Sequence, residues 1–293
     1  MDIVITYVNG MDPVWRNEYE SAVGKQLLSK RYRDWGTLPF LFRAIEKNVP
    51  FVRNVFLVVS SESQVPQWVD REKVRIVLHR DIIPASLLPV FNSTAIEMFL
   101  HRIPGLDEEF VYFNDDIFPM RECLEDTFFV DGKARIGMKK RLIFGGNTFN
   151  HHIKNSDALA RSSAGLGRDL LSLRPQHCCY CLLKSACEEL YELKTEEIEN
   201  SVTPLRRNWN HNIYLFLDYI HHTGRSVNRR TSKKHFSLAV SGIRKICRFI
   251  ENPSCDFVCI NDVEMSAEKF NESRKGIISS FERAFPVKSR FEL

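Results

Sequence analysis

The chain has 293 residues, of which 44% are hydrophobic and 27% are charged. This composition supplies a sizeable core and excludes disordered and fibrous classes of protein. The formal net charge of +4 arises from 41 basic and 37 acidic residues. This excess is too small for a dedicated nucleic-acid-binding protein, so we expect no nucleic-acid partner. The length is compatible with a single globular domain over 1–293, which we expect.

The beginning of the chain and its eight cysteines bear on where the protein works. Met1 and Asp2 run directly into an apolar segment, without the charged and apolar regions of a secretory leader. No apolar stretch approaches the ~18 residues that a membrane span needs. We therefore expect a reduced, cytoplasmic protein, in which the cysteines are not needed as disulfides.

A cysteine-rich segment in the second half could indicate zinc. Its candidate ligands are His177, Cys178, Cys179, Cys181 and Cys187. Their spacing lacks the paired Cys-x-x-Cys pattern of structural zinc sites. Cys187 also falls on an apolar helical stripe, so packing is the favoured interpretation over metal binding.

The first half alternates strand and helix patterns. Apolar runs at 3–8, 55–59, 74–78 and 110–113 predict buried strands. A helical stripe from Leu38 to Ile45 predicts a helix between the first two strands. This alternation predicts a mostly parallel sheet covered by helices.

A second helix of the first half is expected before the fourth strand. Thr94 and Glu97 have the spacing of a capping box, with an apolar stripe behind them. The second half is more helical, with stripes over 182–193 and 209–222 and a last helix from about 270 to 285.

Two adjacent carboxylates end the fourth predicted strand. Asp115 and Asp116 would repel each other unless a cation neutralises them, and a divalent metal can also bridge phosphate oxygens. The structural alternative is an ordinary turn, since Asx residues favour loops. Asn9, Gly10 and Asp12 follow the first strand, so both polar sets are expected at the same sheet edge, where parallel sheets bind ligands.

Several segments together resemble the Stealth family. Residues 2–15 are similar to its first conserved region. Its second region is matched in order by 31–34, 42–53, 64–68, 79–84, 88–93, 96–97, 101–106 and 112–116. His177 and Arg207 are the counterparts of a histidine and an arginine in the third region, and 259–262 with 285–292 resemble the fourth.

The resemblance implies a fold and a reaction. The family includes bacterial capsular polysaccharide phosphotransferases and the animal enzyme that tags lysosomal glycoproteins with N-acetylglucosamine-1-phosphate. It implies a GT-A-like, Rossmann-related α/β core over 1–140 that binds a nucleotide-sugar. Helical additions over 141–293 would complete the acceptor side. Such an enzyme moves a hexose-1-phosphate, for example N-acetylhexosamine-1-phosphate, to a glycan hydroxyl and releases a nucleoside monophosphate, as in capsule or exopolysaccharide synthesis.

The resemblance also implies roles for residues. Asp115 and Asp116 would bind magnesium or manganese and the diphosphate, with Asp116 as an alternative base. His177 is the first choice of general base, against an ordinary loop histidine. Arg207 would clamp phosphate, against a surface arginine at a helix start.

Ten further residues are expected to contact the donor or to support those that do. They are Asn9, Gly10, Asp12, Arg43, Asn92, Ser93, Glu97, His101, Arg102 and Asn114. Gly10 would allow close backbone approach, against a plain tight turn. Trp15 and Trp68 are expected in the core more than on a base or sugar.

Two other functions and one surface stay open. A GT-A glycosyltransferase that moves the sugar alone would share the fold, the metal and the nucleotide. A non-catalytic glycan-binding module would need no clustered carboxylates. The basic stretch 225–248 predicts a contact with an anionic glycan or with the inner face of a membrane, against a solvated face.

Overall fold

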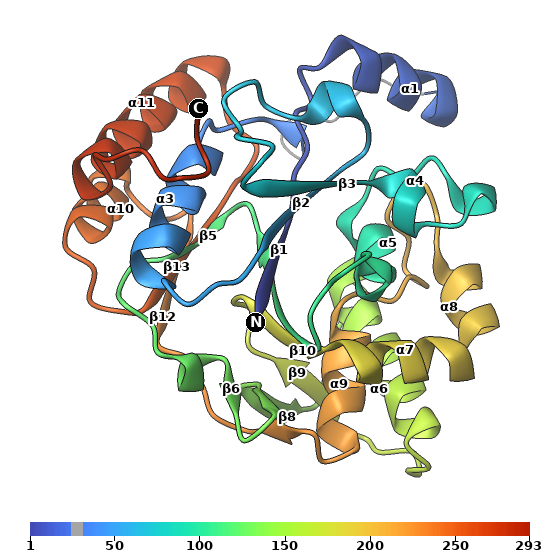
Figure 1. Ribbon diagram of the computed structural model, residues 1–293. Helices are drawn as coiled ribbons and strands as arrows, with labels where there is room; N and C mark the ends of the chain where they lie inside the picture. Colours follow the sequence, from blue (N-terminus) through green and yellow to red (C-terminus); the bar gives the residue numbers. More distant parts are fainter. Residues whose placement is uncertain (25–31) are drawn as a thin grey trace.

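The computed structural model describes residues 1–24 and 32–293, so Arg31, where the second resembling region begins, lies outside the described residues. The central sheet has the strand order β10-β4-β1-β2-β3 (Figure 1). Its strands are β1 (Asp2–Thr6), β2 (Val55–Val59), β3 (Val74–Leu78), β4 (Glu109–Asn114) and β10 (Tyr180–Leu183). The first four strands are mutually parallel and β10 is antiparallel to β4. The predicted mostly parallel α/β sheet is therefore confirmed.

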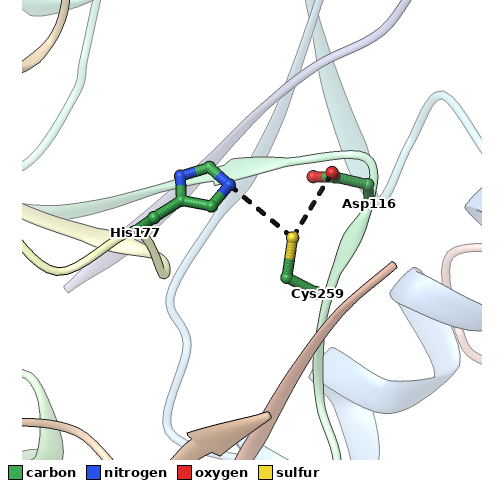
Figure 2. A group of neighbouring side chains, drawn as sticks. All are labelled: Asp116, His177 and Cys259. Atoms are coloured by element: carbon green, nitrogen blue, oxygen red, sulfur yellow. Dashed lines mark hydrogen bonds between the residues drawn. The ribbon is translucent and has the colours of Figure 1, made fainter. Parts of the chain in front are cut away.

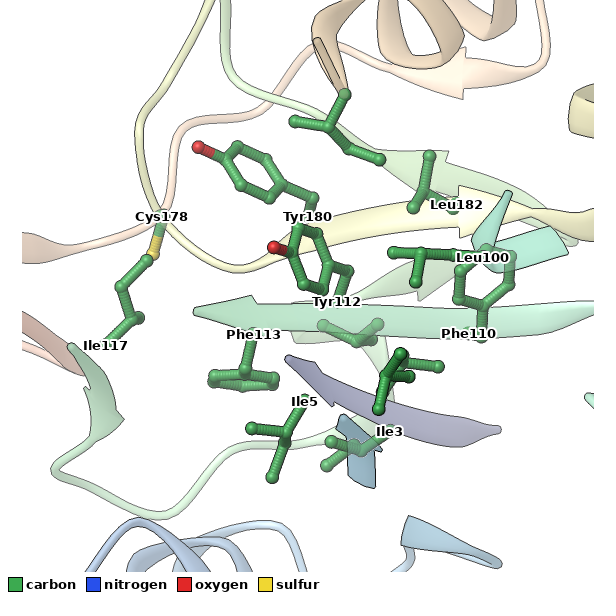
Figure 3. Close-up of a cluster of buried hydrophobic side chains, with 14 of the residues drawn as sticks. Ile3, Ile5, Leu100, Phe110, Tyr112, Phe113, Ile117, Cys178, Tyr180 and Leu182 are labelled. Carbon is green, nitrogen blue, oxygen red and sulfur yellow. The ribbon is translucent and has the colours of Figure 1, made fainter. Parts of the chain in front are cut away.

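The parallel strands form where the apolar runs predict them. β2 and β3 coincide with 55–59 and 74–78, whereas β1 ends two residues before the predicted 3–8 segment does. All five residues of β2 are buried, because helices or loops cover both faces of a parallel sheet. Figure 3 shows the large side chains of β1, β4 and β10 packed together in this core.

Helices pack on the sheet in two groups. On one side, α3 (Leu38–Asn48), α10 (Ile243–Glu251) and α11 (Ala267–Ala284) lie together, with Phe40 stacked on Phe281 at 5.6 Å between ring centres (Figure 1). Beside β10 lie the remaining long helices, α6 (Thr148–Ser163), α7 (Lys184–Leu193) and α9 (Tyr214–His222). These bounds confirm helices in the predicted segments 182–193, 209–222 and 270–285. Among the described residues, no helix is both long and apolar enough to cross a membrane.

Short elements connect the main ones. The short α-helices are α1 (Pro13–Val23), α4 (His79–Ile82), α5 (Ser93–Glu97) and α8 (Thr195–Ser201). The 3-10 helices are η1 (Glu62–Gln64), η2 (Ala85–Leu87), η3 (Leu100–Arg102) and η4 (Glu125–Thr127). Of these, α4 directly follows β3, at the carboxyl end of that strand.

The predicted capping box at Thr94 and Glu97 is wrong. The N-cap is Asn92, two residues before Thr94, and its side chain accepts hydrogen bonds from the Ala95 amide at 3.1 Å and from the Thr94 hydroxyl. Glu97 instead turns into the protein and accepts a 2.8 Å hydrogen bond from the Ile213 amide. Asn is as good an N-cap as Thr, and the long-range contact of Glu97 decides between the two.

Three small sheets were not predicted. They are β12-β13-β5 (Lys233–Ser237, Phe257–Asn261, Ile117–Pro119), β11-β7-β6 (Ser226–Val227, Lys133–Arg135, Phe129–Val130) and β8-β9 (Met138–Arg141, Ser172–Pro175). Together with β10 they join the two halves of the chain, 1–140 and 141–293, around one continuous core. Strands this short carry too few residues for a clear period-two pattern.

Candidate active site

A cavity of about 530 Å³ opens where the four parallel strands end. Thr6, Ser60, His79 and Asn114 come from the carboxyl ends of β1, β2, β3 and β4, or directly after them, and all four line the cavity. Ligands of open parallel sheets bind at this edge, because the loops after the strands diverge there. The cavity is therefore the candidate site.

Four carboxylates line this cavity, those of Asp34, Asp115, Asp116 and Asp262. The Asp115 side chain is exposed to the cavity, and desolvation by the surrounding walls, followed by the charges of Asp116 and Asp34, raises its pKa to about 7. Burial likewise raises the pKa of Asp116 to about 6, although Cys259 and Lys233 act in the opposite direction. The buried Oδ1 atom of Asp116 has no hydrogen-bond partner among the described residues. Unbalanced negative charge and a free oxygen are what a bound cation would relieve.

Asp116 also belongs to a cluster with a histidine and a thiol. The Cys259 Sγ atom lies 3.5 Å from Asp116 Oδ2 and 3.6 Å from His177 Nε2 (Figure 2). One potential ligand atom from each of the three residues lies within 4.8 Å of the other two. The antiparallel pairing of β13 with β5 sets Cys259 opposite Ile117 and so beside Asp116. Sequence reasoning missed Cys259, since it gave this residue no role beyond the resemblance of its segment.

His177 is held so that one ring nitrogen faces the cluster. Its Nδ1 atom lies 2.7 Å from the Tyr180 hydroxyl, and Lys233 donates to its backbone carbonyl. Burial, followed by the charges of Lys233 and His235, lowers the pKa of His177 to about 4. The imidazole is therefore neutral at pH 7, the form that can accept a proton or bind a metal.

Of the two adjacent arginines, Arg206 lines the cavity and Arg207 lies outside the lining. The Arg206 guanidinium donates a 3.0 Å hydrogen bond to Ser93 Oγ at the start of α5. Arg207 takes part through its backbone, whose amide donates to Asn210 Oδ1 at 2.6 Å. Adjacent residues of a loop can point in different directions, so the sequence could not show which of the two arginines lines the cavity.

A second cation at the cavity wall is Arg33. Its guanidinium lies 4.6 Å from the centre of the Phe270 ring, and its Nε atom lies 3.4 Å from Asp262 Oδ2. The buried Nη2 atom of Arg33 has no hydrogen-bond partner within the described parts of the chain. Beside it, Asp34 accepts a 3.2 Å hydrogen bond from the Tyr7 hydroxyl. Arg33, Asp34 and Asp262 lie in segments that resemble conserved regions of the family, but the resemblance implies no particular role for them.

The residues after β1 that were expected to bind the donor form a structural turn. The Gly10 amide donates to the Tyr32 carbonyl at 2.8 Å, and a Cβ on Gly10 would lie 2.4 Å from that oxygen. Asp12 caps α1 and accepts a 2.7 Å hydrogen bond from Gln64 Nε2. The Asn9 side chain accepts from the Met11 amide. All three lie outside the cavity lining, so the close approach at Gly10 serves chain packing.

The other expected donor residues divide into two groups. Asn92, Ser93 and Asn114 line the cavity. Four lie outside the lining, namely Arg43, Glu97, His101 and Arg102. These four make protein contacts instead: Arg43 pairs with Glu292 at 2.7 Å, and His101 and Arg102 lie against the ring of Tyr191.

Trp15 and Trp68, which were expected in the core, both pack against other aromatic side chains. Trp15 is buried against Tyr19, Tyr32 and Phe91, with ring centres 4.9–5.6 Å away, and its edge also reaches the cavity. Trp68 packs edge-on against Phe42. A third tryptophan, Trp35, lines the cavity beside Arg33.

The basic stretch 225–248 does not form one free surface. Arg225 pairs with Glu189 at 2.8 Å, Arg229 lies 3.9 Å from Asp126, and Lys233 reaches the His177 carbonyl. The basic residues of α10 lie elsewhere, around a helix whose apolar face packs against α11. Three of the eight basic residues of the stretch therefore contact protein groups.

Fold and site together define an α/β protein with an acidic, arginine-bearing cavity at the carboxyl ends of a parallel sheet. Residues 31–136 match Stealth protein CR2, conserved region 2. The chain is 30% identical to a capsular polysaccharide phosphotransferase, WcwK, of Streptococcus pneumoniae, over 100% of this chain and 98% of the relative. It is 29% identical to the exopolysaccharide phosphotransferase cps2G of Lactiplantibacillus plantarum, over 100% of this chain and 96% of the relative. The chain therefore belongs to the Stealth family.

Among solved structures, the galactosyltransferase LgtC, in complex with donor and acceptor sugar analogs, is similar with a TM-score of 0.46 and 12% identity. That similarity covers 94% of this chain and 95% of LgtC.

Proposed function

We propose that this protein transfers a hexose-1-phosphate from a nucleotide-diphosphate-sugar to a hydroxyl of an acceptor glycan, in the synthesis of a capsular or exopolysaccharide. The observation that carries the proposal is the meeting of Asp34, Asp115 and Asp116 with Arg206 and His177 in one cavity. Full-length similarity to phosphotransferases of capsular polysaccharide and exopolysaccharide supports the reaction class.

Asp115 and Asp116 are proposed to hold a divalent cation. Their raised pKa values and the free Oδ1 atom of Asp116 fit a group that supplies positive charge. Carboxylate oxygens favour magnesium or manganese over softer metals. When bound, such a cation neutralises charge on the diphosphate oxygens.

The chain's own residues are proposed to handle the proton and the phosphate. The acceptor oxygen forms a bond to the sugar-proximal phosphorus, and the bond from that phosphorus to the bridging oxygen of the diphosphate breaks. The bond between the anomeric carbon and its oxygen stays intact, and a nucleoside monophosphate leaves. His177, neutral and facing Asp116, takes the hydroxyl proton, with Asp116 as the alternative base.

The phosphate clamp is assigned to Arg206 instead of Arg207, because only the first side chain lines the cavity. Its contact with Ser93 fixes the guanidinium at the start of α5, where Asn92 ties the loop to the Thr203 carbonyl at 2.7 Å. A fixed, forked guanidinium can bind two phosphate oxygens at once. Asn92, Ser93 and Asn114 are proposed to contact the donor.

The rival function is a glycosyltransferase that moves the sugar alone, and the two reactions leave phosphorus in different products. We expect phosphorus NMR of enzyme, donor and acceptor to show a new phosphodiester resonance that grows in step with the nucleoside monophosphate. An Asp116→Asn variant under the same conditions is the control for uncatalysed breakdown. A nucleoside diphosphate with no phosphorus in the glycan would show that the rival reaction is the correct one. Unchanged donor after a screen of nucleotide-sugars would support a binding module.

Membrane contact through 225–248 is not carried into this proposal. Arg225, Arg229 and Lys233 in that stretch are engaged by protein groups, as described above.

A further inference from the structure

Two loops at one end of the β8–β9 ribbon place exposed apolar side chains beside basic ones. The loops are 139–144 and 166–171, here called the ribbon tip. Arg141 pairs with Ser172 across the ribbon, so the residues just beyond this pair, Leu142 and Leu171, are neighbours. A salt bridge of 3.6 Å from Lys140 to Asp169 also joins the two loops.

The apolar side chains of the tip project outward. Phe144 is 75% exposed and Leu170 is 88% exposed, and Leu142, Leu166 and Leu171 are also exposed. Isolated exposed apolar residues are normal on protein surfaces, but five within two adjacent loops form a patch. Such patches mark interaction sites, because leaving them in water is unfavourable.

The charge of the tip is positive. Its twelve residues contain Lys139, Lys140, Arg141 and Arg168 and one acidic residue, Asp169, which gives a net charge of 4 − 1 = +3. Asp169 is further engaged by Arg161 at 3.5 Å. The stretch 225–248 is also basic, with eight basic and no acidic residues. The tip differs from that stretch because its positive charge lies beside several exposed apolar side chains.

We propose that the ribbon tip binds the surface of an anionic phospholipid bilayer. Apolar side chains at loop tips insert at the headgroup boundary, while neighbouring lysines and arginines attract anionic lipids. A peptide groove would need a concave surface, whereas these side chains lie at the ends of projecting loops. The tip combines basic residues with five exposed apolar side chains, which is the combination that a bilayer surface binds.

The position of the tip relates it to the cavity. β9 begins at Ser172 beside the tip, and His177 follows its other end. Five residues separate Ser172 from His177, which corresponds to at most roughly 16 Å of extended chain. A bilayer held by the tip would therefore lie close to the proposed reaction centre.

The test is flotation of the purified full chain with vesicles. We expect binding to vesicles of phosphatidylcholine mixed with phosphatidylglycerol, little binding to phosphatidylcholine alone, and weaker binding in high salt. The double variant Phe144→Ser/Leu170→Ser should bind the anionic vesicles at least about tenfold more weakly, because it removes the two most exposed apolar side chains of the tip. A charge variant, Arg141→Gln/Arg168→Gln, should reduce the salt dependence.

Matched controls separate the tip from other surfaces. Val240→Ser/Val287→Ser changes two apolar residues that are 87% and 77% exposed outside the tip, and it should bind as the wild type does. Arg244→Gln/Lys245→Gln tests the basic stretch 225–248 and should also bind normally. Wild-type protein that fails to float with anionic vesicles, or a tip variant that floats as well as wild type, would overturn the proposal. A wild-type dimer that the tip substitutions dissociate, without vesicle binding, would show that a second copy covers the tip.

Vesicle binding is measured without donor or acceptor, so its outcome does not depend on the proposed reaction. Turnover with a water-soluble acceptor should be the same in the tip variant and the wild type, because the substituted residues lie outside the cavity lining. If neither the wild type nor the tip variant turns over the donor while the wild type still binds vesicles, the proposed reaction is contradicted and the membrane proposal is not.

Discussion

At the residue scale, the pKa of Asp115 is raised further than that of its neighbour Asp116 in the cavity. Its carboxylate faces the charges of Asp116 and Asp34 inside a cavity walled by protein, which raises its pKa to about 7. Groups in such surroundings either hold a proton or bind a cation. A donor with two phosphates would add further negative charge, so a cation is the more effective solution for this reaction.

The metal requirement follows from these carboxylates. We expect a chelator to abolish turnover and added magnesium or manganese to restore it. Asp116→Asn should lower the turnover number at least about a hundredfold without unfolding the protein, because one carboxylate charge is lost from the site. Asp126→Asn, at an exposed position near Arg229, is the matched control and should be normal. Full turnover in chelator, with metal absent by elemental analysis, would contradict the metal assignment.

The choice between the two adjacent arginines can be tested with lysine substitutions. Arg206→Lys keeps the charge but removes the forked donors, so kcat/KM for the donor should fall roughly ten- to a hundredfold. Arg207→Lys should stay within about twofold of wild type, because its side chain lies outside the cavity lining. Steady-state kinetics with both variants decides the matter. The reverse pattern would restore Arg207 as the clamp.

At the scale of elements, the segment after α5 supports the site without lining the cavity. His101 on η3 is buried against Tyr191 and Phe216, and its Nδ1 atom has no hydrogen-bond partner in the part of the chain that the structure describes. Burial, followed by the charges of Arg102 and Lys184, lowers the pKa of His101 to about 3. The helix expected behind Thr94 ends at Glu97, and His101 lies on the separate η3 with its side chain packed in the protein.

This burial predicts a pH dependence of stability. The unfolded histidine has a pKa of about 6.5, so the unfolded state binds more protons below that pH and stability falls as the pH falls. Between pH 7.5 and pH 5, His101 should account for a loss of about 2 kcal/mol in the free energy of unfolding. His101→Phe keeps an aromatic ring and should lack this part of the loss. Urea unfolding at both pH values measures it.

A second variant controls for packing. Phe216→Leu disturbs the same contact but introduces no titrating group, so it should destabilise the protein equally at pH 7.5 and pH 5. An identical pH dependence in His101→Phe and wild type would show that the imidazole is not held neutral in the folded state.

At the scale of the whole molecule, the last residues of the chain are joined to α3. Arg43 on α3 makes a two-pronged ion pair with Glu292, at 2.8 and 2.7 Å, and Phe291 packs against Phe42. Glu292 also forms a bridge with Val69 beyond β2. The last residues therefore cover the core, and the Arg43 side chain is engaged by Glu292 outside the cavity lining.

Breaking this pair should affect stability more than catalysis. Arg43→Ala leaves Glu292, which is largely buried, without its cation, and we expect a loss of roughly 2–3 kcal/mol in the free energy of unfolding. The double variant Arg43→Ala/Glu292→Ala should lose less than the sum of the two single variants, because the residues interact directly. Thermal unfolding of all three variants tests this. A raised KM for the donor with unchanged stability would instead favour the donor-binding role.

Local patterns in the sequence determined the parallel strands, the main helices and the carboxylates at the end of β4. Continuous apolar runs mark strands buried on both faces, and a parallel arrangement brings their carboxyl ends together at the same sheet edge. Asp115 and Asp116 directly follow β4, so their place at this edge depends on local structure alone. The family resemblance pointed in addition to the second conserved region, and two residues of that region, Asn92 and Ser93, line the cavity.

Only the tertiary structure decided which distant side chains join them. Cys259 lies beside Asp116 although 143 positions separate the two in the chain, because β13 pairs with β5. The direction of Arg206 and the burial of His101 likewise depend on loops and helices from other parts of the chain. Such contacts are set by packing between elements, and the periodicity within one element contains no information about its partner. The sequence alone could therefore locate the edge of the site but could not select its full set of residues.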